Sequence, residues 1–99
     1  MFRGEMRVVW TVPAARDLDV IGEYIARQNP GAAQRITQRI RARTKSLAAH
    51  PYLGRPGRVT NVRELVVTST PFIVAYRVVD DRIEILAVFH GARRWPDTF

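Results

Sequence analysis

The chain has 99 residues, of which 46% are hydrophobic, and its formal net charge is +7. This length and hydrophobic content predict a single folded domain over residues 1–99 and exclude a disordered chain. The absence of cysteine excludes disulfides and zinc sites built on thiolates. No apolar run of about 18 residues is present to cross a membrane, and the first ten residues lack the apolar segment of a signal peptide. We therefore expect a cytoplasmic protein.

The positive charge is carried almost entirely by arginine, because Lys45 is the only lysine among 16 cationic residues. A surface of this sign predicts an anionic partner, which would be nucleic acid, an acidic protein or a membrane surface. Guanidinium groups bind carboxylates and phosphates through two parallel hydrogen bonds, whereas lysine acts as a hydrated point charge. The arginine bias has a second explanation in the base composition of the genome.

The first strand is predicted at residues 6–12, after a flexible leader at residues 1–5. Its segment contains several valines and Trp10, a composition typical of strands. Met6 is an alternative to Met1 as the initiator, since the strand begins there. Pro13 is expected to end the strand.

Two amphipathic helices are predicted next, at residues 14–28 and 31–49, and they form a helical hairpin. Asn29 can cap the second helix, and Pro30 suits a first helical position. Apolar residues recur at every third or fourth position and mark the buried stripes, which are Ala14, Leu18, Ile21 and Ile25 in the first helix and Ala33, Ile36, Ile40 and Leu47 in the second.

Charged residues occupy the remaining surface of both helices. We interpret the cations of the second helix as a solvated face rather than a binding face, because the helix dipole favours positive charge toward the C-terminus. Asp17, Asp19 and Glu23 fall in the early turns of the first helix, where the dipole favours negative charge. The cations of the second helix are Arg35, Arg39, Arg41, Arg43 and Lys45.

Residues 62–95 predict a three-stranded antiparallel meander, joined to the helices by a surface loop at residues 52–61. The pair Asp80-Asp81 is expected to close the last hairpin. The predicted fold is α+β, with an N-terminal strand, an αα-hairpin and the meander, and both helices packed on one face of the sheet. The strands of the meander are expected where β-branched and aromatic residues concentrate, at residues 66–67, 72–79 and 83–89.

Recognisable catalytic motifs are nearly absent, so the candidate functional residues are the cations of the loop, the meander and the tail. We expect no metal site and no cofactor. If the protein is a nuclease, its candidate catalytic residues are Arg58, Arg63, Arg77, His90 and Arg93.

Two of these candidates have structural explanations as alternatives. Strand alternation places Arg77 on the same face as apolar residues, so it lies at a margin of the sheet or pairs with an acid on a flanking strand, Glu64 or Glu84. His90 ends the last strand. It is either an acid or base that acts near neutral pH or a strand-end residue bonded to backbone, and both interpretations stay open.

The order of these segments along residues 6–95 resembles the RelE/ParE superfamily of toxins from bacterial type II toxin–antitoxin, or plasmid stabilisation, modules. The resemblance implies the α+β fold described above and a toxin that inhibits growth. It is carried by the spacing of four segments, AARDLDVIGEYIARQNPGAA, HPYLGRPGRV, RELVV and PFIVAYRVVDDRIEILAVFHGARRWP.

RelE-like members of that superfamily cleave messenger RNA on the ribosome, using cations that stabilise the phosphate and groups that move protons. Arg93 falls at one of their catalytic positions. Ile73 stands where they carry another arginine, and the tail position of their tyrosine falls on or near Phe99. Isoleucine cannot hold a phosphate, and phenylalanine cannot exchange a proton.

These departures make the chain more similar to the ParE branch, whose members poison DNA gyrase. The resemblance then implies that the protein is not itself catalytic and that Arg93, Arg94 and Trp95 bind the target. A ribosome-dependent endoribonuclease is the alternative. A general nucleic-acid-binding module is a third hypothesis, which rests on charge alone.

The resemblance also implies a protein partner, a cognate antitoxin whose acidic C-terminal segment wraps the toxin. Operator DNA is then contacted only indirectly, through the DNA-binding part of the antitoxin, and no membrane partner is expected. The charge of the toxin complements such a segment. Its expected docking place is the groove between the helical hairpin and the sheet.

Overall fold

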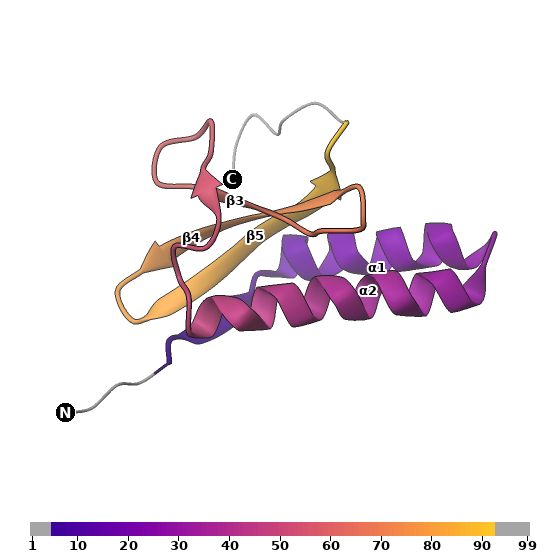
Figure 1. Cartoon of the computed structure of the whole chain (residues 1–99), viewed down its shortest axis with the longest axis horizontal. Coiled ribbons are helices and arrows are strands. Elements are labelled where there is room, and N and C mark those ends of the chain that lie inside the picture. Colours follow the sequence, from indigo (N-terminus) through magenta and orange to yellow (C-terminus); the bar gives the residue numbers. More distant parts are fainter. Residues whose placement is uncertain (1–4, 93–99) are drawn as a thin grey trace.

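Two antiparallel helices lie against one face of a five-stranded sheet (Figure 1). The structure is a computed structural model and describes residues 5–92. Neither helix in this range is long and apolar enough to cross a membrane. The elements, in chain order, are β1 Arg7–Trp10, α1 Val12–Ala26, α2 Pro30–Lys45, the short 3-10 helix η1 Ser46–Ala48, β2 Arg55–Pro56, β3 Arg63–Val66, β4 Phe72–Val79 and β5 Arg82–His90.

The junction between β1 and α1 differs from the prediction. The strand ends at Trp10 and the helix begins at Val12, so Pro13 lies in the first turn of α1 instead of separating strand from helix. Proline is tolerated there because the first turn has no carbonyl to receive its missing N–H. Thr11 is the cap, since its Oγ1 accepts from the N–H of Ala14 at 3.3 Å and donates to the carbonyl of Ile85 at 2.7 Å.

The helical hairpin is confirmed, with α1 beginning and ending two residues earlier than predicted and α2 shorter than predicted. Asn29 caps α2 by accepting the N–H of Ala32 at 3.0 Å, and Pro30 is the first helical residue. Helix α2 ends at Lys45, and most of the remaining residues that were predicted to be α-helical, up to residue 49, form the 3-10 helix η1 instead. The acids of α1 lie beyond its first turn, so the helix dipole does not account for them.

The sheet has the order β1-β5-β4-β3-β2 and is mixed, because β1 runs parallel to β5 while the other pairs are antiparallel. The predicted meander and its Asp80-Asp81 turn are confirmed. The first strand of the meander is longer than predicted and ends before Val67. The two residues of β2 lie inside the segment predicted as a loop, where strand composition is weak.

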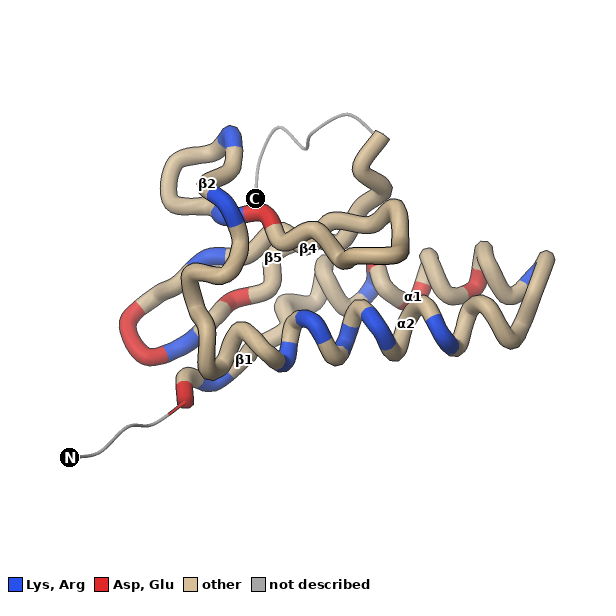
Figure 2. The backbone as a smooth tube through the Cα atoms, viewed as in Figure 1, with Lys and Arg blue, Asp and Glu red and all other residues tan. Residues whose placement is uncertain are grey.

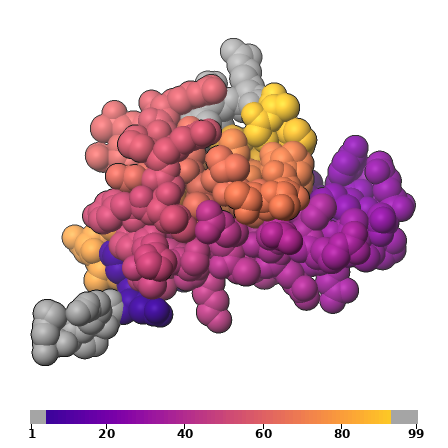
Figure 3. Space-filling model, viewed as in Figure 1, coloured from indigo at the N-terminus to yellow at the C-terminus, as the bar shows by residue number. Residues whose placement is uncertain are grey.

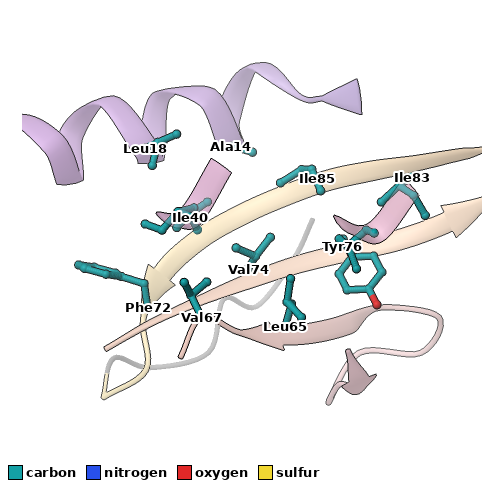
Figure 4. Packing of buried hydrophobic residues seen from close by; sticks show 12 residues of the cluster. Ala14, Leu18, Ile40, Leu65, Val67, Phe72, Val74, Tyr76, Ile83 and Ile85 are labelled. Carbon is teal, nitrogen blue, oxygen red and sulfur yellow. The ribbon is translucent and has the colours of Figure 1, made fainter. Parts of the chain in front are cut away.

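The core lies between the helices and the inner face of the sheet, and strand alternation decides which residues enter it. Val74 and Tyr76 of β4 belong to the same core cluster as Leu18 of α1 and Ile40 of α2, and the Tyr76 ring lies at the end of the cluster near Leu65 and Ile83 (Figure 4). Ala75, which lies between Val74 and Tyr76, faces outward and belongs to a second, smaller apolar cluster. A bulge follows, because Ala75 pairs with Ala87 but Tyr76 pairs with Ile85. Leu86 and Ala87 therefore both contribute to the outer cluster.

Candidate functional site

Arg63, one of the predicted catalytic cations, is occupied by contacts with the loop that precedes β3. Its Nη1 donates to the carbonyl oxygen of Gly54 at 2.6 Å. Its guanidinium carbon also lies 4.8 Å from the centre of the Tyr52 ring, a distance at which a cation is attracted to the ring face. Arg63 is half-buried and pairs with Tyr76 across the sheet, so it points toward the helical face. These contacts give Arg63 a structural role.

Arg77 is paired with Glu84, as one of the two alternatives predicted. The Nε of Arg77 donates to Oε1 of Glu84 at 2.7 Å, while Arg82 donates to Oε2 of the same carboxylate at 2.9 Å. These two hydrogen bonds, first that from Arg77 and then that from Arg82, hold the pKa of Glu84 below its usual value. The other predicted partner, Glu64, is buried and pairs instead with Arg55 at 3.0 Å.

The lowered pKa of Glu84 makes part of the stability dependent on pH. A carboxyl whose pKa is lower in the folded protein contributes stability above its unfolded value, here 4.5, and loses it as pH falls through the folded value. We expect Glu84→Gln to destabilise the protein at pH 7. Once the pH has fallen below both the unfolded and the folded pKa of Glu84, the variant should be about as stable as wild type. Urea unfolding between pH 7 and pH 2 measures this.

The control for that prediction removes the two donors. With Arg77→Gln and Arg82→Gln already present, adding Glu84→Gln should change the midpoint by the same amount at every pH. A wild-type-like pH dependence in that background would show that other groups cause it.

His90 lies at the far end of the β4–β5 hairpin, and its ring is engaged with neighbouring groups. Its Nδ1 accepts the N–H of Ala92 at 3.1 Å. The ring meets Phe72 edge-on, with the two centroids 5.7 Å apart. The structure therefore shows His90 bonded to backbone, and its role as an acid or base stays a prediction.

The candidate cations do not converge on one point among residues 5–92. Arg77 lies opposite Glu84 and Phe72 lies opposite His90. At about 3.3 Å per residue, the stretch of β5 between Glu84 and His90 spans about 20 Å. Arg63 and Arg77 also point to opposite faces, since they lie at neighbouring register positions. Arg58 is exposed on the loop after β2, whereas Arg93, Arg94, Trp95 and Phe99 lie outside the described residues.

Tyr76 fastens this loop to the sheet and was not predicted to do so. Its hydroxyl donates to the carbonyl of Pro51 and accepts the N–H of Gly54, both at 2.9 Å. The side chain is fully buried, and this burial raises the pKa of the phenol, although the hydrogen bond from Gly54 lowers it in part. Two backbone groups of the loop therefore depend on one side chain.

An apolar hollow of about 450 Å³ lies between α1 and the ends of β4 and β5. Figure 3 shows this recess between the purple helices and the yellow end of β5. Val20 and Tyr24 border it and are 63% and 62% exposed, so an exposed apolar pair adjoins the hollow. Its lining residues are Asp17, Val20, Ile21, Tyr24, Phe72, Val88, Phe89 and His90.

Asp17 explains why α1 stays beside this end of β5. Strand β1 pairs with β5 only as far as Ile85, which leaves the edge of β5 beyond it without a strand partner. The N–H of Val88 donates instead to Oδ2 of Asp17 at 3.0 Å. The carboxylate thus replaces a strand carbonyl at the floor of the hollow. The sequence predicted a groove between the helical hairpin and the sheet but not its lining residues. Val20 and Tyr24, an apolar pair four residues apart outside the buried stripe, are the signal that could have located it.

Comparison with known proteins identifies the family. Residues 8–95 match the family described as the ParE toxin of the type II toxin-antitoxin system, parDE. The chain belongs to this family. The predicted RelE/ParE superfamily and its ParE branch are therefore confirmed, and the protein is a toxin of the ParE type.

Relatives of this ParE-type toxin match it along nearly their whole length. It is 46% identical over 90 residues to "Putative toxin Y4kP" of Sinorhizobium fredii strain NGR234, covering 91% of this chain and 93% of that protein. It is 41% identical over 87 residues to Toxin RelE2 of Caulobacter vibrioides, covering 88% of this chain and 97% of that protein.

A solved structure confirms the fold of the ParE-type toxin. A chain of the chromosomal ParDE TA system from P. aeruginosa is 34% identical and matches with a TM-score of 0.80. The match covers 87% of this chain and 96% of that chain. The α+β architecture predicted from the sequence is thus confirmed, with five strands in place of the four that were predicted.

Proposed function

We propose that this ParE-type toxin inhibits growth by binding and poisoning DNA gyrase, as part of a plasmid-stabilising module. The observation that carries this choice is the dispersal of Arg63, Arg77 and His90 over separate parts of the sheet. Phosphoryl transfer needs cations and proton donors converging on one phosphate. Ile73, at the position of a catalytic arginine in RelE-like enzymes, packs into the outer apolar cluster.

We also propose that residues 1–99 form one domain that acts in the cytoplasm and that its target is bound by Arg93, Arg94 and Trp95. Gyrase acts on cytoplasmic DNA, and a cationic, aromatic tail fits an interface in which arginine and tryptophan often dominate the binding energy. A ribosome-dependent endoribonuclease is the alternative function. It is motivated by the 41% identity to a protein named Toxin RelE2.

Purified gyrase and messenger RNA distinguish the two functions. With gyrase, ATP and supercoiled plasmid, the toxin is expected to produce linear plasmid after detergent and protease treatment, the sign of trapped covalent complexes. Arg93→Ala with Arg94→Ala should abolish this effect while circular dichroism stays unchanged. Normal supercoiling together with transcripts cleaved on the ribosome, and lost in His90→Ala or Arg93→Ala, would establish the nuclease instead.

A cognate antitoxin is the second part of the proposed function, and the hollow beside α1 is its proposed dock. The hollow is lined mostly by apolar side chains, and two of them are largely exposed in the isolated toxin. An amphipathic segment would cover these side chains. The burial would favour binding by about 25 cal/mol per Å² of apolar surface removed from water. The solved relative comes from a ParDE system, which supports a protein partner of this type.

A further inference from the structure

The outer face of α2 concentrates positive charge without any acid. Figure 2 shows blue positions repeating along α2 and no red ones, whereas α1 carries both signs. Cations on the sheet have acidic partners, such as Arg55 with Glu64 and Arg77 with Glu84. No ion pair with a described residue exists for the cations of α2, which are Arg35, Arg39, Arg41, Arg43 and Lys45.

Three of these cations follow one another at intervals of four residues and are here called the arginine row: Arg35, Arg39 and Arg43. Each step turns about 40° beyond a full circle, so the row winds around α2 from the exposed Arg35 to the half-buried Arg43. Residues four apart in a helix lie one above the other, at about 6 Å per step, so the row is about 12 Å long. Arg35 and Arg39 are exposed. Arg43 is half-buried, and its Nε is buried without a hydrogen-bond partner. This guanidinium is partly desolvated and lacks a counter-charge, which an anion at the row would supply.

The stability of the helix does not explain the whole row. The helix dipole favours cations in the last turn of α2, where Arg43 and Lys45 lie. Arg35 is in the first half of the helix, where the dipole gives it no advantage. The residues four positions to either side of it are Gly31 and Arg39, so it also lacks an acidic neighbour within the helix.

The surroundings of the row favour a phosphate backbone over a protein segment. None of the exposed large hydrophobic residues in the described chain belongs to α2, so a docking protein helix would bury little apolar surface there. The face also lacks an exposed aromatic side chain, on which single-stranded bases would stack. Each strand of a B-DNA duplex carries one phosphate per about 3.4 Å of helix axis, so a row of about 12 Å is long enough to contact two or three of them.

We propose that the arginine row of α2 binds the phosphates of duplex DNA without reading its sequence. This contact goes beyond the proposed function, since it uses other residues than the proposed gyrase-binding residues and the proposed antitoxin dock. The neighbouring helix α1 carries three acids, Asp17, Asp19 and Glu23. Their charge would repel a polyanion from α1 and favour its binding to α2. Recognition of the operator sequence stays with the antitoxin. Where gyrase is the target, the row raises the concentration of toxin on the DNA that gyrase works on.

Fluorescence anisotropy of a labelled 20-base-pair duplex of arbitrary sequence, titrated with the full-length toxin between 50 and 200 mM salt, tests the proposal without gyrase. Each lost phosphate contact makes the log–log salt slope shallower by about 0.9. Arg35→Gln with Arg39→Gln should therefore reduce the slope by about 2 and the affinity at 50 mM salt by at least about tenfold. Circular dichroism checks that α2 stays folded.

The matched control is Arg16→Gln with Arg27→Gln, which removes one exposed cation from α1 and one from its C-cap and changes the net charge equally. This variant should keep the wild-type slope. Equal losses in the two double variants, or no binding at 50 mM salt, would overturn the proposal. Equal competition by duplex RNA, or by a polyglutamate peptide at the same ionic strength, would overturn the assignment to DNA.

Discussion

Gly54→Ala is expected to destabilise the toxin by about 3 kcal/mol, a large share of the total for a small domain. A Cβ atom at this position would lie 2.7 Å from the carbonyl oxygen of Glu64 and 2.8 Å from Cε1 of Tyr76. Neither atom can retreat easily, because Tyr76 is fully buried and the carbonyl belongs to the sheet. The displaced loop also loses its hydrogen bonds to the Tyr76 hydroxyl and to Arg63.

Urea unfolding, with the midpoint compared at an unchanged m-value, measures this effect. Gly31→Ala is the matched control, because its Cβ would lie 3.4 Å from Nη1 of Arg35 and 3.5 Å from Oδ1 of the cap residue Asn29, which are ordinary contacts. That substitution should stabilise the protein by about 0.5–1 kcal/mol, since alanine favours the helix more than glycine does. A Gly54→Ala midpoint equal to wild type would contradict the close packing of this loop.

Tyr76→Phe separates the lost hydrogen bonds from the steric clash. It keeps the ring but leaves the N–H of Gly54 and the carbonyl of Pro51 without their partner, at a cost of about 1–3 kcal/mol. Its effect should therefore be smaller than that of Gly54→Ala.

Val20→Asp should weaken binding of the cognate antitoxin at least about 30-fold, which corresponds to a residue contributing about 2 kcal/mol to the interface. Val20 lines the hollow and is 63% exposed, so the substitution does not disturb the core of the free toxin. In the complex, a carboxylate at this place would be desolvated beside apolar groups and near Asp17. Tyr24→Asp should act in the same direction.

Isothermal titration calorimetry with the antitoxin gives the affinity, and co-expression shows whether neutralisation is lost while growth inhibition remains. Val12→Asp is the control, because Val12 is equally exposed on α1, at 62%, and does not line the hollow. Unchanged antitoxin binding by Val20→Asp and Tyr24→Asp would place the antitoxin elsewhere. The gyrase effect would be untouched by that result, so the two parts of the proposed function are tested separately.

Several elements could be predicted because short-range chemistry determines them. The buried stripes of the two helices follow from apolar residues three and four apart, and the alternation along β4 places Tyr76 inward and Arg77 outward. Asn29 and Pro30 begin α2 for reasons contained in those two residues. The Asp80-Asp81 turn is likewise determined by its own residues. Asp80 adopts the left-handed conformation that such turns require, with φ of 53°.

Other elements depend on partners far along the chain and were missed or misplaced. Thr11 caps α1, and its hydroxyl also donates to the carbonyl of Ile85, 74 residues away. The two residues of β2 become a strand only because Arg55 meets Glu64 on β3. Arg63 looked like a free catalytic cation, yet a carbonyl and an aromatic ring of the preceding loop occupy it.

By itself, the sequence determined the α+β class, the helical hairpin, the meander and the toxin family, because these follow from local periodicity and from residue order. Tertiary structure alone decided that β1 adds to β5 in parallel and stops at its middle. This leaves Val88 to be satisfied by Asp17 and opens the apolar hollow beside α1. The physical reason is that hydrogen-bond satisfaction and burial depend on which segments meet in space. The same holds for charge, since the cations of the sheet have acidic or carbonyl partners while the arginine row of α2 has no acidic partner among residues 5–92.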